Sequence, residues 1–229
     1  MLIKSALITQ ASGSVGGFTA ARNRAGMYIR ARAKPVDPSS TLQQTMRSIM
    51  QAASIAWHQT LTETQRTGWE TYASNVPIIG RLGDPIYLTG MAHYIRSRAA
   101  AAYYSLTPVA DAPTVFNLAT FTPVTVSISE ATQQLSVVLD NTDAWANEDD
   151  AALLVSQSKP VNPTVNYFRG PFVRRGKVDG DSVTPPTSPA AFTSAYPVVE
   201  DQRFFAFVRA IRADGRLSTP QYATGTVLA

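Results

Sequence analysis

The sequence contains no cysteine, and only two of its 229 residues are histidine. The lack of cysteine excludes disulfides, thiolate metal sites and cysteine nucleophiles together. His58 and His93 lie in segments of helical periodicity, and neither has a carboxylate or second imidazole at the spacing of a metal ligand. We therefore expect no metal and no cofactor, and we predict that the protein is not an enzyme.

Long apolar runs are also missing. No stretch approaches the roughly 20 apolar residues that a helix needs to span a bilayer, so we expect no membrane-spanning segment and no membrane partner. The opening MLIKSALITQASG combines a single lysine with a very short apolar run. That pattern is too weak for a secretory signal.

Charge is distributed unevenly along the chain. Residues 1–106 contain eleven lysines and arginines and four carboxylates, which gives +7, so the remaining residues contribute −3 to the formal net charge of +4. Residues 13–35 form the most basic stretch and contain no carboxylate. Such asymmetry indicates two parts of the chain with different neighbours.

The basic stretch predicts a β-hairpin within an extended arm over residues 1–38. Phe18–Arg22 and Met27–Ala33 have strand character, and NRAG between them favours a turn. The preceding glycines predict a flexible or tightly bent lead-in. Alternation in the second strand would place its cations on one face. Arginine suits bidentate bonds to carboxylates and phosphates, so we predict an assembly interface, with a solvated strand face as the alternative. The predicted interface residues are Arg22, Arg24, Tyr28, Arg30, Arg32 and Lys34.

Residues 39–106 have the three-and-four spacing of helices and predict a helical base. The first helix begins at Ser40 or Thr41 and ends near Leu61. TETQ at residues 62–65 is a capping box that begins the second, and the third runs from about residue 90 to residue 106. The apolar face predicted for the first helix consists of Leu42, Met46, Ile49, Met50, Ala53, Ala56, Trp57 and Leu61.

At the Pro-rich segment TPVADAPT the hydrophobic period changes from 3.6 to 2, which predicts a domain boundary and a β-sandwich over residues 107–229. FFAFVRAIRADGRLSTP resembles the late strands of fibronectin type III or immunoglobulin-like modules, a resemblance that concerns fold alone. The predicted fold class is α+β, with an N-terminal β-hairpin arm and three-helix region followed by an immunoglobulin-like β-sandwich.

The sandwich sequence contains one strongly acidic segment, DNTDAWANEDD, at residues 140–150. Its carboxylates make calcium binding conceivable. The segment lacks the ligand spacing and the sixth-position glycine of an EF-hand, so we interpret it as a solvated loop between strands.

The N-terminal half resembles a family of proteins encoded by tailed phages and prophages. The resemblance lies in the order of SGSVGGFTAARNRAGMYIRARAKPVDPSSTLQQTMR, LTETQRTGWETYASNVP and LTGMAHYIRSRAA, with Asp37 where the family pattern has asparagine. It implies a virion structural protein, assembled in the host cytoplasm and attached to the capsid as a decoration, cement or minor head protein. Its expected partners are capsid or other virion proteins, bound through the basic N-terminal half in many copies as a homo-oligomer.

Two alternatives stay open. One is a tail or fibre component for host adhesion, with the sandwich as the adhesin. The other is a virion protein that binds nucleic acid through its arginines. Against nucleic acid, no aromatic residue other than Tyr28 is interleaved with the basic run, and the acidic second half would repel DNA.

Overall fold

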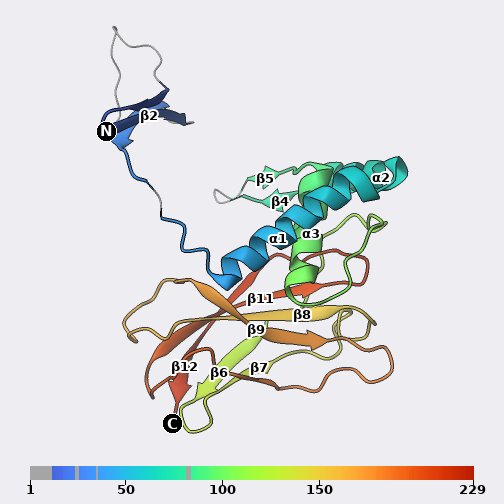
Figure 1. The fold of residues 1–229 in the computed structure, drawn as a ribbon. Coiled ribbons are helices and arrows are strands. Elements are labelled where there is room, and N and C mark those ends of the chain that lie inside the picture. The colour runs from blue at the N-terminus through green and yellow to red at the C-terminus, as the bar shows by residue number, and fades with distance from the viewer. Residues whose placement is uncertain (1–11, 24–25, 35, 81–83) are drawn as a thin grey trace. The chain divides into compact units, whose positions relative to one another are not determined.

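A computed structural model describes residues 12–23, 26–34, 36–80 and 84–229. The chain forms two compact units, Met1–Gln44 and Thr45–Ala229, and the fold class is α+β, as predicted (Figure 1). Across the described ranges, no helix is both long and apolar enough to cross a membrane. The finer division into residues 1–38, 39–106 and 107–229 stays a prediction.

The first unit contains a three-stranded antiparallel sheet in the order β1-β2-β3. The predicted hairpin corresponds to β2 (Phe18–Asn23) and β3 (Gly26–Ala31). The lead-in that the glycines predicted to be flexible or tightly bent forms β1 (Gly13–Val15), which pairs with β2 through a tight turn. Gly16 adopts a φ of +55° in the turn between them, a left-handed conformation that glycine tolerates without strain.

Three α-helices follow, and each has a side-chain cap. At the start of the first, the Ser40 hydroxyl accepts from the Gln43 amide at 3.4 Å, and the Gln43 side chain accepts from the Ser40 amide at 3.2 Å. Thr62 and Gln65 form the predicted capping box of α2 (Glu63–Asn75), and Thr89 caps α3 (Gly90–Tyr103). The predicted first helix consists of α1 (Thr41–Ile55) and a π-helical turn, Ala56–Thr60. Its apolar face is buried only from Ala53 onward, because Leu42 and Met50 are 53% and 46% exposed.

Aromatic rings hold the helices of the second unit together. Trp69 of α2 lies edge-on against Tyr72 and Tyr94, with ring centroids 5.9 and 5.6 Å away, and Trp57 packs on Tyr94 at 5.6 Å. The indole nitrogen of Trp69 donates to the Ala110 carbonyl at 2.9 Å. These rings therefore fix both the helices and the segment that follows them. A short hairpin of β4 (Ile78–Ile79) and β5 (Pro85–Ile86) connects α2 to α3.

The rest of the second unit is a seven-stranded sheet in the order β10-β7-β6-β12-β11-β8-β9. All neighbouring strands are antiparallel except β6 and β12, which pair in parallel at Val227↔Ile128 and Leu228↔Ser129. The sheet is nearly closed, since β9 and β10 also lie in contact. The strands are β6 (Thr125–Ser129), β7 (Gln134–Val138), β8 (Ala152–Ser158), β9 (Phe172–Asp179), β10 (Ala190–Thr193), β11 (Arg203–Ile211) and β12 (Gln221–Leu228).

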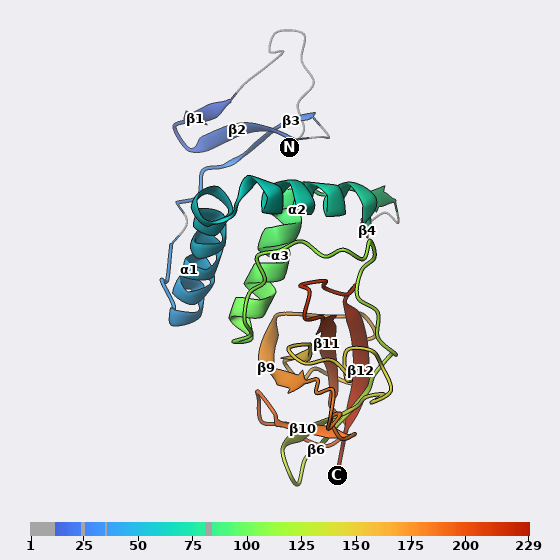
Figure 2. The same ribbon diagram turned by 90° about the vertical axis from the view of Figure 1, so that its right-hand side faces the viewer.

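The main core lies inside this curved sheet, and α3 packs against part of its outer face (Figure 2). Leu153 and Val155 of β8 face the core, while Ala152 and Leu154 pack in a second cluster with α3. Every residue of β8 is therefore buried. Burial on both faces explains why ALLV is continuously apolar and does not alternate.

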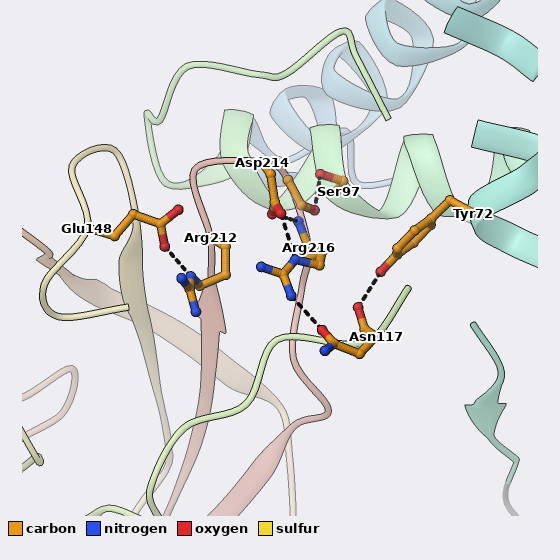
Figure 3. A network of polar contacts seen from close by, with 8 residues as sticks. Tyr72, Ser97, Asn117, Glu148, Arg212, Asp214 and Arg216 are labelled. Carbon is orange, nitrogen blue, oxygen red and sulfur yellow. Dashed lines mark hydrogen bonds and ion pairs between the residues drawn. The ribbon is translucent and has the colours of Figure 1, made fainter. Parts of the chain in front are cut away.

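Polar contacts also join the helices to the sheet, mainly at the turn after β11 (Figure 3). Ser97 of α3 donates to the Gly215 carbonyl at 2.6 Å, and Tyr72 donates to the Asn117 carbonyl at 2.9 Å. Arg216 contacts both Asp214 and Asn117. Gly215 has a φ of +85°, so the turn in RADGRLS depends on a left-handed glycine.

Gly180, which follows β9, lies tightly against the loop that precedes β8. A Cβ at this position would lie 2.1 Å from the Trp145 carbonyl oxygen and 2.6 Å from that of Glu148. We expect Gly180→Ala to lower the free energy of unfolding by about 3 kcal/mol, since backbone would have to move. Urea denaturation followed by tryptophan fluorescence measures this. Gly170→Ala is the matched control, because its new Cβ would meet only ordinary contacts at 3.5–3.6 Å. Equal losses in the two variants would contradict the packing argument.

Candidate assembly interface

The strand register sorts the side chains of the first unit onto two faces. Phe18 pairs with Ala31, Ala20 with Ile29 and Arg22 with Met27. Directly opposed residues of antiparallel strands share a face, so this face is apolar apart from one arginine. Val15 belongs to it as well, because it pairs with Phe18.

The second face is polar. It carries Thr19 opposite Arg30 and Ala21 opposite Tyr28, together with Ser14, whose hydroxyl lies 2.8 Å from that of Thr19. Arg30 is exposed and Tyr28 is half-buried. The alternation of the sequence thus correctly separates a polar from an apolar face of β3.

The predicted interface residues do not all gather on one face. Arg22 lies on the apolar face, opposite to the face that carries Tyr28 and Arg30. Arg32 and Lys34 follow the end of β3, where the Arg32 amide donates to the Gly17 carbonyl at 2.7 Å. The shared face predicted for Tyr28, Arg30, Arg32 and Lys34 therefore holds for Tyr28 and Arg30 within β3, and it stays a prediction for Arg32 and Lys34. Arg24 lies outside the described residues.

Both faces of the first unit are accessible. Val15 and Phe18 on the apolar face are 84% and 63% exposed. Arg22, Arg30, Arg32 and Lys34 are exposed too, and within the described chain none of them forms an ion pair. Exposed apolar surface beside unpaired cations is characteristic of binding surfaces.

The two histidines differ in burial. His93 is 2% exposed, its ring lies edge-on against Tyr72 at 5.3 Å, and its Nε2 has no hydrogen-bond partner. Burial, reinforced by the positive charge of Arg96, lowers the pKa of His93 below its ordinary value. His58 is exposed in the π-helical turn. Among the residues described, no group of three or more histidines and carboxylates is placed to hold a metal ion.

The acidic loop uses its carboxylates to fix its own backbone. Asp140 accepts hydrogen bonds from the amide and hydroxyl of Thr142, and these bonds lower the pKa of Asp140. Asp149 accepts equivalent bonds from Ser182, and Glu148 pairs with Arg212. The segment, interpreted from its sequence as a solvated loop, therefore also has local structural roles that its composition does not predict.

Comparisons with known proteins identify no family. No protein-family model and no curated protein matches the sequence. One similar solved structure is a family 76 glycoside hydrolase from a bovine Bacteroides thetaiotaomicron strain, with 9% sequence identity and a TM-score of 0.34. The match covers 48% of this chain and 21% of the hydrolase chain. A likeness this weak carries no argument about fold or activity.

The buried His93 predicts a pH dependence of stability. Its folded pKa is depressed, so between that value and the ordinary pKa of about 6.5 only the unfolded imidazole binds a proton. The free energy of unfolding should therefore be constant above about pH 7 and fall as the pH drops through about 6.5. Urea unfolding at a series of pH values measures this.

The two histidines allow a matched comparison. His93→Gln should flatten the decrease in stability between about pH 7 and pH 5.5, whereas His58→Gln should retain it, because His58 is exposed. If both variants keep the same slope, another group causes the pH dependence and the assignment to His93 is wrong.

Proposed function

We propose that this protein is a non-enzymatic structural protein of a bacteriophage virion, attached to the capsid as a decoration, cement or minor head protein. The observation that carries the proposal is the first unit, which presents exposed cations and an exposed apolar face from one small sheet. The resemblance of the N-terminal half to phage-encoded proteins supports the same class. Capsid or other virion proteins are the proposed partners, with many copies per particle.

The two faces would contribute differently to binding. Burial of Val15 and Phe18 against a neighbour would supply non-directional affinity, at about 25 cal/mol per Å² of apolar surface removed from water. Arg22, Arg30 and the cations after β3 would select acidic surfaces and accelerate encounter. A sheet this small gains stability by packing against a partner, and repetition on a symmetric particle would add avidity.

For the second unit we propose an immunoglobulin-like sandwich. The order β10-β7-β6-β12-β11-β8-β9 corresponds to strands E-B-A-G-F-C-C′ of such domains, with β6 and β12 as the parallel A–G pair. Only two residue pairs join β6 to β12, which supports a division there into layers of three and four strands. The main core draws residues from strands of both layers.

The alternatives remain nucleic-acid binding and host adhesion. Single-stranded nucleic acid is usually bound along a continuous basic track with aromatic rings for stacking. The described arginines instead lie on opposite faces of the sheet, with Arg22 on one and Arg30 on the other. This arrangement favours a protein partner that contacts the sheet from more than one side.

Incorporation into particles tests the proposal. We expect the double variants Val15→Ser/Phe18→Ser and Arg30→Ser/Arg32→Ser each to reduce the copies per purified particle by at least about tenfold. The reduction for the arginine variant should grow with salt, because exposed charge contacts are screened. Quantitative mass spectrometry of particles washed at low and high salt measures both effects.

Arg175→Ser is the matched control, because Arg175 belongs to the second unit, where its guanidinium donates to the Thr193 carbonyl. This variant should incorporate normally. Normal incorporation of both double variants would overturn the arm as an attachment surface. Binding of the unaltered protein to DNA-free shells would support a protein partner, whereas binding that requires packaged DNA would favour the nucleic-acid alternative.

A further inference from the structure

A second polar surface lies in the second unit, in the loop that connects β8 to β9. Residues 159–171 enclose an open cavity of about 510 Å³, and Lys159, Asn162 and Arg169 are its charged or amide-bearing side chains. No carboxylate lines this cavity. The second unit bears a net negative charge over residues 107–229, so a pocket with two cations and no acid stands out from its surroundings.

Several backbone carbonyls of the loop accept hydrogen bonds from within the protein. The Val161 carbonyl accepts from the Arg203 amide at 3.0 Å, and the Val165 carbonyl accepts from the Arg203 guanidinium at 2.8 Å. The Lys159 carbonyl accepts from the Ser158 hydroxyl, and the Asn162 carbonyl accepts from the Val165 amide. Because these acceptors are engaged, the pocket offers a ligand mainly hydrogen-bond donors.

Three side chains of the pocket have hydrogen-bond donors that no acceptor of the described chain engages. The Asn162 Oδ1 accepts from the amide and hydroxyl of Thr164, which leaves the Asn162 NH₂ group to donate elsewhere. Within the described chain, the Arg169 guanidinium makes no hydrogen bond or ion pair, and Lys159 only lies over the Tyr196 ring, at 5.6 Å. Two cations and an amide without acceptors form a set suited to an oxyanion.

Most other cations of the sheet region are already engaged. Lys177 pairs with Asp179, Arg212 with Glu148, and Arg175 donates to the Thr193 carbonyl. Arg209 lies over the Phe207 ring with its Nε buried. The exposed and unengaged state of Lys159 and Arg169 is thus a local property of this loop, not a general feature of the sheet.

The loop is held in place and presents aromatic surface. Val161 bridges to Arg203 of β11, and the Phe168 ring packs on Phe205 at 5.2 Å and on Tyr222 at 5.3 Å. Tyr167, next to this anchor, is 59% exposed. A fixed loop that combines donors, cations and an exposed ring is preorganised for a ligand with both an anionic group and an apolar ring face.

We propose that this pocket binds an anionic saccharide. The carboxylate, sulfate or phosphate of one sugar unit would lie between Lys159, Arg169 and the Asn162 amide. Tyr167 belongs to the same loop and does not line the cavity, so the C–H face of a sugar ring that extends out of the cavity would lie against it. A volume of about 510 Å³ accommodates a sugar unit and exceeds the needs of a single inorganic ion. Polynucleotides are disfavoured because they require an extended cationic track, whereas Lys159 and Arg169 are two cations of a single pocket.

Calorimetric titration of the full chain tests the proposal with a glucuronate-containing hexasaccharide, its carboxyl-reduced neutral form, and sulfated and phosphorylated oligosaccharides of equal length. We expect saturable binding of at least one anionic oligosaccharide, with affinity at least about tenfold above that of the neutral form. Which of the three binds most tightly identifies the oxyanion. Lys159→Gln and Arg169→Gln should each weaken that binding by about tenfold or more, while Arg175→Gln leaves it within about twofold.

Several outcomes would overturn the proposal. They are no saturable binding of any anionic oligosaccharide up to about 10 mM, equal affinity for the neutral form, and equal weakening by Arg175→Gln. Tighter binding of a single-stranded oligonucleotide or an acidic peptide of matched charge would reassign the pocket to that ligand class. Urea denaturation of each variant confirms that changes in binding do not arise from unfolding.

Discussion

The packing of the helices on the sheet in the second unit depends on one contact. In this contact, side chains of α3 donate hydrogen bonds to the turn that follows β11. Arg96 donates to the carbonyls of Leu217 and Ser218, and Ser97 donates to that of Gly215. Burial, together with the nearby charge of Arg209, lowers the pKa of Arg96 to about 10, so the carbonyl bonds hold a cation in an unfavourable environment. This contact keeps α3 over the outer face of β8, and without it that strand would expose apolar side chains on a second side.

The two units differ in whether their individual cations have partners, and not only in net charge. In the first unit the described cations Arg22 and Arg30 are exposed on opposite faces of a small sheet. In the described part of the second unit, most cations contact carbonyls, carboxylates or rings. Lys159 and Arg169 are exceptions within an otherwise acidic part of the chain. The net charge of each segment therefore predicts the basic arm. It does not predict the pocket of Lys159 and Arg169, because that pocket depends on which cations lack a partner.

Features set by neighbouring residues could be predicted from the sequence. The capping box at Thr62 lies where TETQ predicts it, and the apolar run of ALLVSQS coincides with β8. The strand β10 has no comparable local signal, because AAFT is short and is stabilised by pairing with β7, far away in sequence. The position of Arg22 on the apolar face follows from the hairpin register, which composition does not reveal. The free donor of Asn162 likewise depends on how Thr164 folds back, so no sequence motif could have indicated it.

The position of β12 also determines how the second unit can fold. This strand lies between β6 and β11, and its parallel partner β6 lies about 100 residues earlier, as the bond from Ser129 to Ala229 illustrates. The three strands that begin the sheet order cannot join the other four until that distant pairing has formed. Loop closure over such a separation delays the productive encounter, so we expect slow folding, with the edge of β6 open to other chains until β12 arrives.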